Sequence, residues 1–93
     1  MLRTKDVQAN AVNDILNERV RQDSKWGEQN HHPFAWMTIL GEEYGEACQD
    51  ALRAQYKLTI TSDYRKELIE VAAVALAAVE CLDRHNGEFD RGH

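Results

Sequence analysis

"KELIEVAAVALAAVECL" (66–82) is the stretch of sequence that decides the fold. On a helical wheel it is apolar nearly all round: one side carries Leu68, Ala72, Ala75, Val79 and Leu82, and the other carries Val74, Ala77, Ala78 and Cys81. A helix that is apolar on both sides is normally surrounded by protein. The sequence therefore predicts an all-α fold in which a helix over about 62–85 is central.

Two carboxylates begin the second side of this helix. Glu67 and Glu70 lie on a stripe that continues, in steps of three and four residues, through Val74, Ala77 and Cys81. Burial of an ionised carboxylate is costly unless a cation or a hydrogen-bond donor compensates the lost hydration. We therefore expect Glu67 and Glu70 to have a cation, a partner or an altered pKa.

A second group of carboxylates lies in "GEEYGEACQDAL" (41–52), inside a predicted helix over about 33–56. Glu42, Glu43 and Glu46 fall within about 100° of one another on the wheel. The other side of this helix, its expected core side, holds Met37, Leu40, Tyr44, Ala47, Cys48 and Ala51. Because the short connector "KLTITSD" favours antiparallel packing of the two helices, the two acidic groups can approach each other.

An all-oxygen site of this kind suits Mg²⁺ or Mn²⁺, which take carboxylate ligands and keep positions for water or phosphate. A di-iron bundle needs Glu-x-x-His on two helices, whereas the spacing Glu28 to His31 falls in a loop. A zinc site made from His31, His32 and Cys48 has no CxxC pair to support it. For the acidic residues of both helices, ordinary structural roles, a solvated surface above all, remain the alternative.

A first helix is predicted over about 5–23, with Thr4 as its cap. The apolar residues that return at helical spacing are Val7, Ala11, Val12, Ile15, Leu16 and Val20. Arg19 falls inside this apolar arc, so it needs an anion. The alternative is that its stem covers apolar surface while the guanidinium reaches water or a nearby carboxylate.

The segment "SKWGEQNHHPF" (24–34) reads as a loop, because Gly27 and Pro33 interrupt the helical pattern. Its position just before the acidic helix makes it a candidate wall for a substrate site. An indole can stack on a nucleobase, an amide can read the base edge, and cations can meet phosphate. The candidate substrate-binding residues are Arg19, Lys25, Trp26, Asn30 and His31. For Trp26 and Trp36 a place in the core is the alternative.

Length and composition agree with one small helical domain over residues 1–93. The net charge of −5 argues against a surface that holds a nucleic-acid polymer. The N-terminal residues show no signal peptide, and the longest apolar run, 71–79, is too short to cross a membrane. Cys48 and Cys81 are interpreted as reduced core thiols, so we expect a cytoplasmic protein.

The acidic residues also resemble a known motif. Glu42-Glu43-Tyr-Gly-Glu46, followed after 20 residues by Glu67-Leu-Ile-Glu70, resembles the EExxE…ExxD signature of the MazG-like all-α nucleoside triphosphate pyrophosphohydrolases. "ERVRQDSKWGEQNHHPFAW" (18–36) is similar to the lead-in of short, single-domain members from bacteria and phages. The resemblance covers roughly residues 15–85.

The resemblance implies a helical bundle that hydrolyses (deoxy)nucleoside triphosphates to the monophosphate and pyrophosphate, a reaction that removes non-standard or surplus nucleotides. It implies that Glu43, Glu46, Glu67 and Glu70 hold Mg²⁺, and that Glu42 orients or deprotonates the attacking water. Two departures stand out: the last motif position, usually Asp, is Glu70, and "EFDRGH" is too short for the fourth helix that members commonly carry.

Three helices, one of them apolar all round, leave apolar surface uncovered, so we expect a homodimer or a dimer of dimers that shares a helical bundle. A second function from another class also fits the sequence: a non-catalytic helical module that binds nucleotide or a protein partner. The inward position of Glu67 and Glu70 favours chemistry, because a pure scaffold gains stability from apolar residues there.

Overall fold

The computed structural model describes residues 3–57 and 62–85, and these ranges form three α-helices and no strand. Helix α1 spans Thr4–Trp26, α2 spans Pro33–Lys57 and α3 spans Ser62–His85. The predicted all-α fold is confirmed, and each predicted boundary lies within three residues of the observed one. The expected left-handed cap at Asn86 and Gly87, like the connector residues 58–61, lies outside the described residues.

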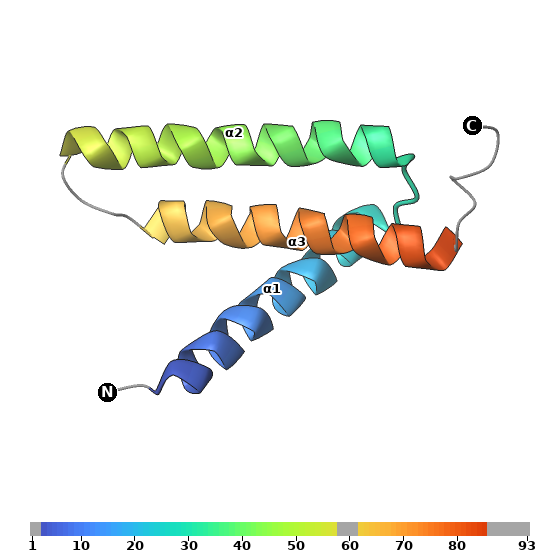
Figure 1. The fold of residues 1–93 in the computed structure, drawn as a ribbon, viewed down its shortest axis with the longest axis horizontal. Coiled ribbons are helices and arrows are strands. Elements are labelled where there is room, and N and C mark those ends of the chain that lie inside the picture. Colours follow the sequence, from blue (N-terminus) through green and yellow to red (C-terminus); the bar gives the residue numbers. More distant parts are fainter. Residues whose placement is uncertain (1–2, 58–61, 86–93) are drawn as a thin grey trace.

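Helices α2 and α3 run antiparallel along most of their length, and α1 crosses α3 obliquely (Figure 1). This arrangement makes α3 the central element, because it packs against both of the other helices. Its position agrees with its sequence, which is apolar on two sides. The antiparallel pair also brings the middle of α2 next to the first turns of α3, where the acidic residues lie.

The end of α1 is set by Gly27, whose φ of 73° lies in the left-handed region that favours glycine. The Gly27 amide donates a hydrogen bond to the Asp23 carbonyl at 2.8 Å and so closes the last turn. Helix α1 therefore continues three residues beyond its predicted end, and Lys25 and Trp26 belong to its last turn rather than to a loop. At the other end the cap residue is Arg3 rather than Thr4, and its side chain makes no capping hydrogen bond.

The core lies between α2 and α3. Its centre is a cluster in which Trp36 packs with three residues of α3, namely Val74, Ala77 and Cys81. Trp36 is only 4% exposed. The predicted seam of α3 is therefore confirmed over its apolar part, and the alternative that placed Trp36 in the core is correct.

Several residues predicted to be internal are exposed. Helix α1 has no buried residue, and Val7, Val12, Leu16 and Val20 are exposed. On α2 the side chains of Met37, Tyr44 and Cys48 are also exposed, so the interpretation of Cys48 as a core thiol is wrong for this chain. The reason is geometric: each outer helix buries only the strip that faces α3. The apolar arcs of the sequence are wider than these strips.

Two ion pairs fix α1 on α3. Arg19 donates two hydrogen bonds to Glu80, at 3.2 Å from Nε and 2.6 Å from Nη2, and Arg65 Nη2 lies 2.7 Å from Asp14 Oδ2. The exposed pair of Arg65 and Asp14 contributes about 0.2–1 kcal/mol, so it orients α1 more than it stabilises it, whereas the pair of Arg19 and Glu80 is partly buried. Among the described helices, none has the length and hydropathy to span a membrane.

Candidate metal and nucleotide site

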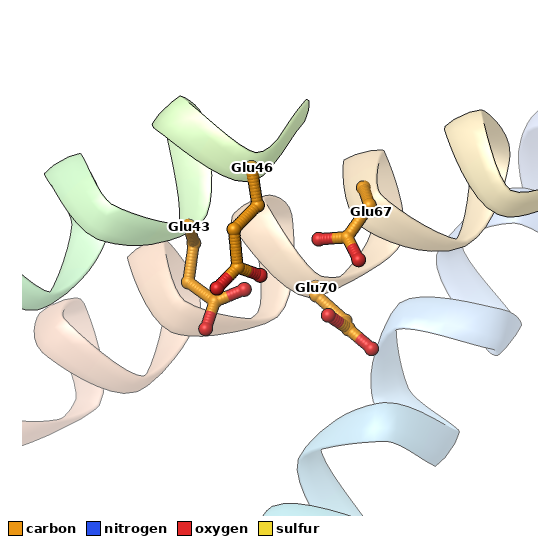
Figure 2. Close-up of side chains that lie close together, drawn as sticks. All are labelled: Glu43, Glu46, Glu67 and Glu70. Carbon is orange, nitrogen blue, oxygen red and sulfur yellow. The ribbon is translucent and has the colours of Figure 1, made fainter. Parts of the chain in front are cut away.

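Four glutamates from two helices converge at one point. Glu43 and Glu46 come from α2, and Glu67 and Glu70 come from α3 (Figure 2). One carboxylate oxygen can be chosen from each so that all four lie within 4.8 Å of one another. The structure thus brings together the four residues that the sequence pairs by spacing.

Helical spacing explains the convergence. Each pair is separated by three residues, so its two side chains leave the same face of a helix about one turn apart. Antiparallel packing then turns the face of α2 toward the face of α3. The apolar seam of Val74, Ala77 and Cys81 continues directly into Glu70 and Glu67, because all five lie on one stripe of α3.

The carboxylates repel one another where they meet. Burial, followed by the charges of Glu70 and Glu46, raises the pKa of Glu67 to about 7, and burial with the charges of Glu46 and Glu70 also raises the pKa of Glu43. Glu43 Oε2 and Glu67 Oε2 are buried atoms without a hydrogen-bond partner in the described part of the chain. A site with these properties gains stability from a proton or a cation.

The donor set fits a hard divalent cation. Two oxygens on opposite sides of an ion at about 2.1 Å are roughly 4.2 Å apart. The spread of up to 4.8 Å between the chosen oxygens is close to that limit, so small side-chain rotations suffice to surround one ion. Four carboxylates from rigid helices therefore make a candidate site for Mg²⁺ or Mn²⁺. Glu70, which replaces the aspartate of the motif, takes part in the cluster.

A cavity of about 360 Å³ adjoins this cluster. Glu43 and Glu70 belong to both the cluster and the cavity wall. The rest of the wall comes from the last turns of α1, the following loop, the start of α2 and the middle of α3: Glu18, Arg21, Gln22, Lys25, Trp26, Gln29, Trp36, Ile39 and Val74. Ligand sites of small molecules have volumes of about 300–1,000 Å³, so the space suits part of a nucleotide.

Two of the predicted substrate-binding residues line this cavity. Lys25 and Trp26 both belong to its wall, and Lys25 Nζ lies 4.7 Å from the centre of the Trp26 ring. Trp26 is 60% exposed, so it is not a core residue. The last turn of α1, not a loop, positions both side chains.

Arg19 is placed elsewhere. Its side chain is 11% exposed and forms ion pairs with Glu80 and Asp23, at 2.6 Å and 3.1 Å. Arg19 is not part of the cavity wall. Its expected inward position is confirmed, but the anion that it meets is a protein carboxylate.

Asn30 and His31 also lie outside the cavity wall. The Asn30 Oδ1 accepts hydrogen bonds from Arg84 at 3.2 Å and 3.0 Å, which ties the α1–α2 loop to the end of α3. The His31 ring packs edge-on against Trp36, with ring centres 4.9 Å apart. In this structure both residues support the loop and the core.

Glu42 is exposed on α2 and is not one of the four clustered glutamates. Its neighbour Glu43 points into the cluster, and one step along a helix turns a side chain by about 100°. Glu42 therefore lies outside the cluster in this structure.

The sequence did not predict three of the α1 residues that line the cavity. Glu18, Arg21 and Gln22 line it, although none of them was a candidate. The side of α1 that faces the rest of the protein contains Ala11, Ile15, Glu18 and Gln22, which are all half-buried. These four residues recur in steps of three and four, a spacing that indicates one face of a helix. They are, however, less apolar than the neighbouring stripe of Val12, Leu16 and Val20.

Comparison with models of protein families, with curated proteins and with solved structures gave no match to this chain. The functional argument therefore rests on the residues and their geometry.

Proposed function

We propose that this protein hydrolyses (deoxy)nucleoside triphosphates to the nucleoside monophosphate and pyrophosphate with Mg²⁺, or Mn²⁺ in its place. The observation that carries the proposal is the convergence of Glu43, Glu46, Glu67 and Glu70 at the edge of a cavity. The resemblance of these residues to the MazG-like motif supplies the reaction class. Removal of non-standard or surplus nucleotides is the role that follows from it.

The four carboxylates hold the cation in this proposal. When bound, the cation neutralises charge on the phosphates and lowers the pKa of a coordinated water. Lys25 and Trp26 bind the nucleotide from the cavity wall, the first through charge and the second by stacking on the base. The last turn of α1 fixes both residues relative to Glu43 and Glu70, which orients the triphosphate toward the carboxylates.

Glu42 is the proposed base. Glu42 directly precedes Glu43 in the sequence, and in this proposal its exposed carboxylate accepts the proton of the attacking water and releases it to solvent. An experiment can distinguish this role of Glu42 from the cation-binding role of Glu43 and Glu46. Glu42→Gln is expected to lower turnover by more than tenfold while the affinity for Mn²⁺ changes little.

The decisive assay measures pyrophosphate release from a panel of canonical and modified nucleoside triphosphates in the presence of Mg²⁺. Wild-type protein is expected to hydrolyse at least one member of the panel, and Glu43→Gln is expected to lose at least 100-fold in rate, about 2.7 kcal/mol of barrier. Asp83→Asn, an exposed acidic residue of α3 outside the cluster, is the control. Wild-type protein without turnover on any member would exclude catalysis.

The same assay separates the alternative function, a non-catalytic module that binds nucleotide or a protein partner. Such a module binds nucleotide in the cavity without releasing pyrophosphate, and Glu43→Gln then changes binding alone. The carboxylate oxygens of Glu43 and Glu67 that lack partners among the described residues favour a cation-binding role over a purely structural one, because burial of unpartnered carboxylates lowers the stability of a scaffold.

We also propose that two copies of the chain associate through α2 and α3. Leu68, Ala72, Ala75, Val79 and Leu82 follow one another in steps of four and three residues, the spacing of a helix–helix seam, and three of them are exposed large apolar residues. Met37, Gly41, Tyr44 and Cys48 repeat this spacing on α2. A homodimer, or a dimer of dimers, covers such stripes.

Sedimentation velocity tests this assembly. Wild-type protein is expected to sediment as a dimer or tetramer at micromolar concentration, and Val79→Lys is expected to dissociate it. Ser62→Lys adds a lysine at an exposed position of the same helix, about 100° around its axis from Val79, and is expected to preserve the assembly. A monomeric wild type would contradict this part of the proposal.

A further inference from the structure

The cavity wall contains a second cationic side chain, Arg21, besides Lys25. Arg21 lines the cavity together with Glu43 and Glu70, two members of the carboxylate cluster. It belongs to α1, and Figure 2 shows Glu70 reaching toward the light blue ribbon of that helix. A cationic side chain from one element therefore lies beside the acidic site formed by the other two.

Glu18 holds the Arg21 guanidinium in place. Arg21 Nε donates to Glu18 Oε1 at 2.7 Å, and Nη2 donates to Glu18 Oε2 at 2.6 Å. This two-point pair fixes the plane of the guanidinium group. The Glu18 side chain is 12% exposed, whereas that of Arg21 is 55% exposed, so the buried partner serves as the anchor and the open partner reaches the cavity.

The pair with Glu18 leaves Arg21 able to bind an anion. A guanidinium has five N–H donors, and the contacts with Glu18 use one on Nε and one on Nη2. The remaining donors are sufficient for two-point contact with phosphate oxygens, the geometry in which arginine binds phosphate best. The hydrogen bonds to Glu18 and the charge of that carboxylate, and more weakly the charges of Glu70 and Glu43, raise the pKa of Arg21, so it stays protonated beside the cluster.

The negative charge of the carboxylate cluster and its ligand requires cationic side chains such as Arg21. Four carboxylates carry more negative charge than one divalent cation cancels, and a triphosphate adds further negative charge. Lys25 and Arg21 are the residues of the cavity wall that carry positive charge. Arg19 cannot serve, because Glu80 and Asp23 already occupy its donors.

We propose that Arg21, held by Glu18, binds the phosphate groups of the nucleotide on the cavity side of the carboxylate cluster. This role rests on the proposed function, because it assumes a cation in the cluster and a phosphorylated ligand in the cavity. Glu18 acts as a positioning residue that sets the direction of the guanidinium. The preferred ligand chemistry is a di- or triphosphate group, which offers several oxygens to Arg21 and the cation together.

Isothermal titration calorimetry with two probes, Mn²⁺ and inorganic pyrophosphate, tests the proposal. Arg21→Gln is expected to bind Mn²⁺ within about twofold of wild type and to bind pyrophosphate, in the presence of Mn²⁺, at least tenfold more weakly. Arg21→Lys is expected to recover part of the affinity, because the charge returns without the fixed fork. Glu18→Gln is expected to fall between wild type and Arg21→Gln.

Arg3→Gln is the matched control. It removes the same charge from the same helix, and its ion pair with Asp6 has the same spacing of three residues as that of Glu18 and Arg21. It lies 18 residues from Arg21, about 27 Å along the helix. Its affinity for pyrophosphate is expected to equal that of wild type. Circular dichroism confirms that all variants keep their helical content.

The outcomes distinguish this proposal from the proposed function. If Arg21→Gln binds pyrophosphate as tightly as wild type does, the role of Arg21 is wrong while the function stands. If wild-type protein binds pyrophosphate through Mn²⁺ and Arg21 but hydrolyses no triphosphate, catalysis is wrong while the anion site stands. A wild type that binds neither Mn²⁺ nor pyrophosphate overturns both.

Discussion

The interface between α2 and α3 has two ends that differ in what stabilises them. At one end Trp36 packs against Ala77 and Cys81. At the other end Glu43 and Glu67 meet in the carboxylate cluster. The apolar end is stabilised by burial of side chains, although Trp36 Nε1 has no hydrogen-bond partner among the described residues. At the acidic end the pKa values of Glu43 and Glu67 are raised, and one carboxylate oxygen of each lacks a partner there. One continuous seam thus combines a packed core with a site that is stabilised by an added proton or cation.

The largest effect is expected at the apolar end. Trp36→Ala removes the largest side chain of the core cluster and is expected to lower the free energy of unfolding by about 3–5 kcal/mol. Small domains are stable by about 5–15 kcal/mol, so this is a large share of the total. Urea unfolding followed by circular dichroism measures the change. Trp26→Ala, at a site that is 60% exposed, is the control and is expected to change stability by less than about 1 kcal/mol.

A substitution at Glu67 makes the acidic end of the interface more apolar. Glu67→Leu removes a half-buried carboxylate from the cluster and is expected to raise the free energy of unfolding by about 1–2 kcal/mol at pH 8 without added metal. The same variant is expected to lose Mn²⁺ binding. A lower stability at pH 8 would show that Glu67 has a favourable partner in the protein and would contradict the comparison of the two ends.

The contrast between the ends also predicts a dependence on pH. The pKa of Glu67 is about 7 in the folded protein against an ordinary value of 4.5, so the folded state binds more protons than the unfolded state between these values. Stability of the metal-free protein is therefore expected to fall as the pH rises from about 4.5 through 7 and to change little from this group above that range. The raised pKa of Glu43 acts in the same direction.

Thermal unfolding at pH 5.5 and pH 8 measures this effect. A difference of about 1 kcal/mol corresponds to a shift of the midpoint by roughly 4–8 °C in a domain of this size. Added Mn²⁺ is expected to raise the midpoint at pH 8 and to have little effect at pH 5.5, where protons occupy the cluster. In Glu67→Leu the difference between the two pH values is expected to shrink.

The stripe of α3 that faces α2 could be predicted from the sequence, because it depends only on residues that are close together in the chain. The positions of Glu67, Glu70, Val74, Ala77 and Cys81 on one stripe follow from helical geometry alone. A short connector then implies an antiparallel partner, and the acidic face of α2 meets the stripe. For this reason the fold class and the facing acidic groups were accessible without a structure, whereas the choice of Glu43 and Glu46 over Glu42 came from the resemblance.

The way in which α1 packs on α3 could not be predicted from the sequence in the same way. Whether Arg19 or Arg21 faces the cavity depends on how α1 is rotated on α3, and that rotation is fixed by long-range contacts such as Arg19 with Glu80 and Asp14 with Arg65. The apolar stripe of α1 suggested a different rotation from the one observed. When both sides of a helix carry apolar residues, the more apolar side is not necessarily the buried one.

The smallest effect on cation binding is expected where the two ends meet. Val74 is buried in the core cluster and also lines the cavity beside Glu70, so it belongs to both environments. Val74→Ala removes two methyl groups and is expected to lower the free energy of unfolding by about 1–2 kcal/mol. Because α2 and α3 still present their carboxylates, affinity for Mn²⁺ is expected to stay within about twofold of wild type in calorimetric titration. If both quantities fell together, the packed end and the acidic end would not be separable, since the carboxylates would then depend on the adjacent packing for their positions.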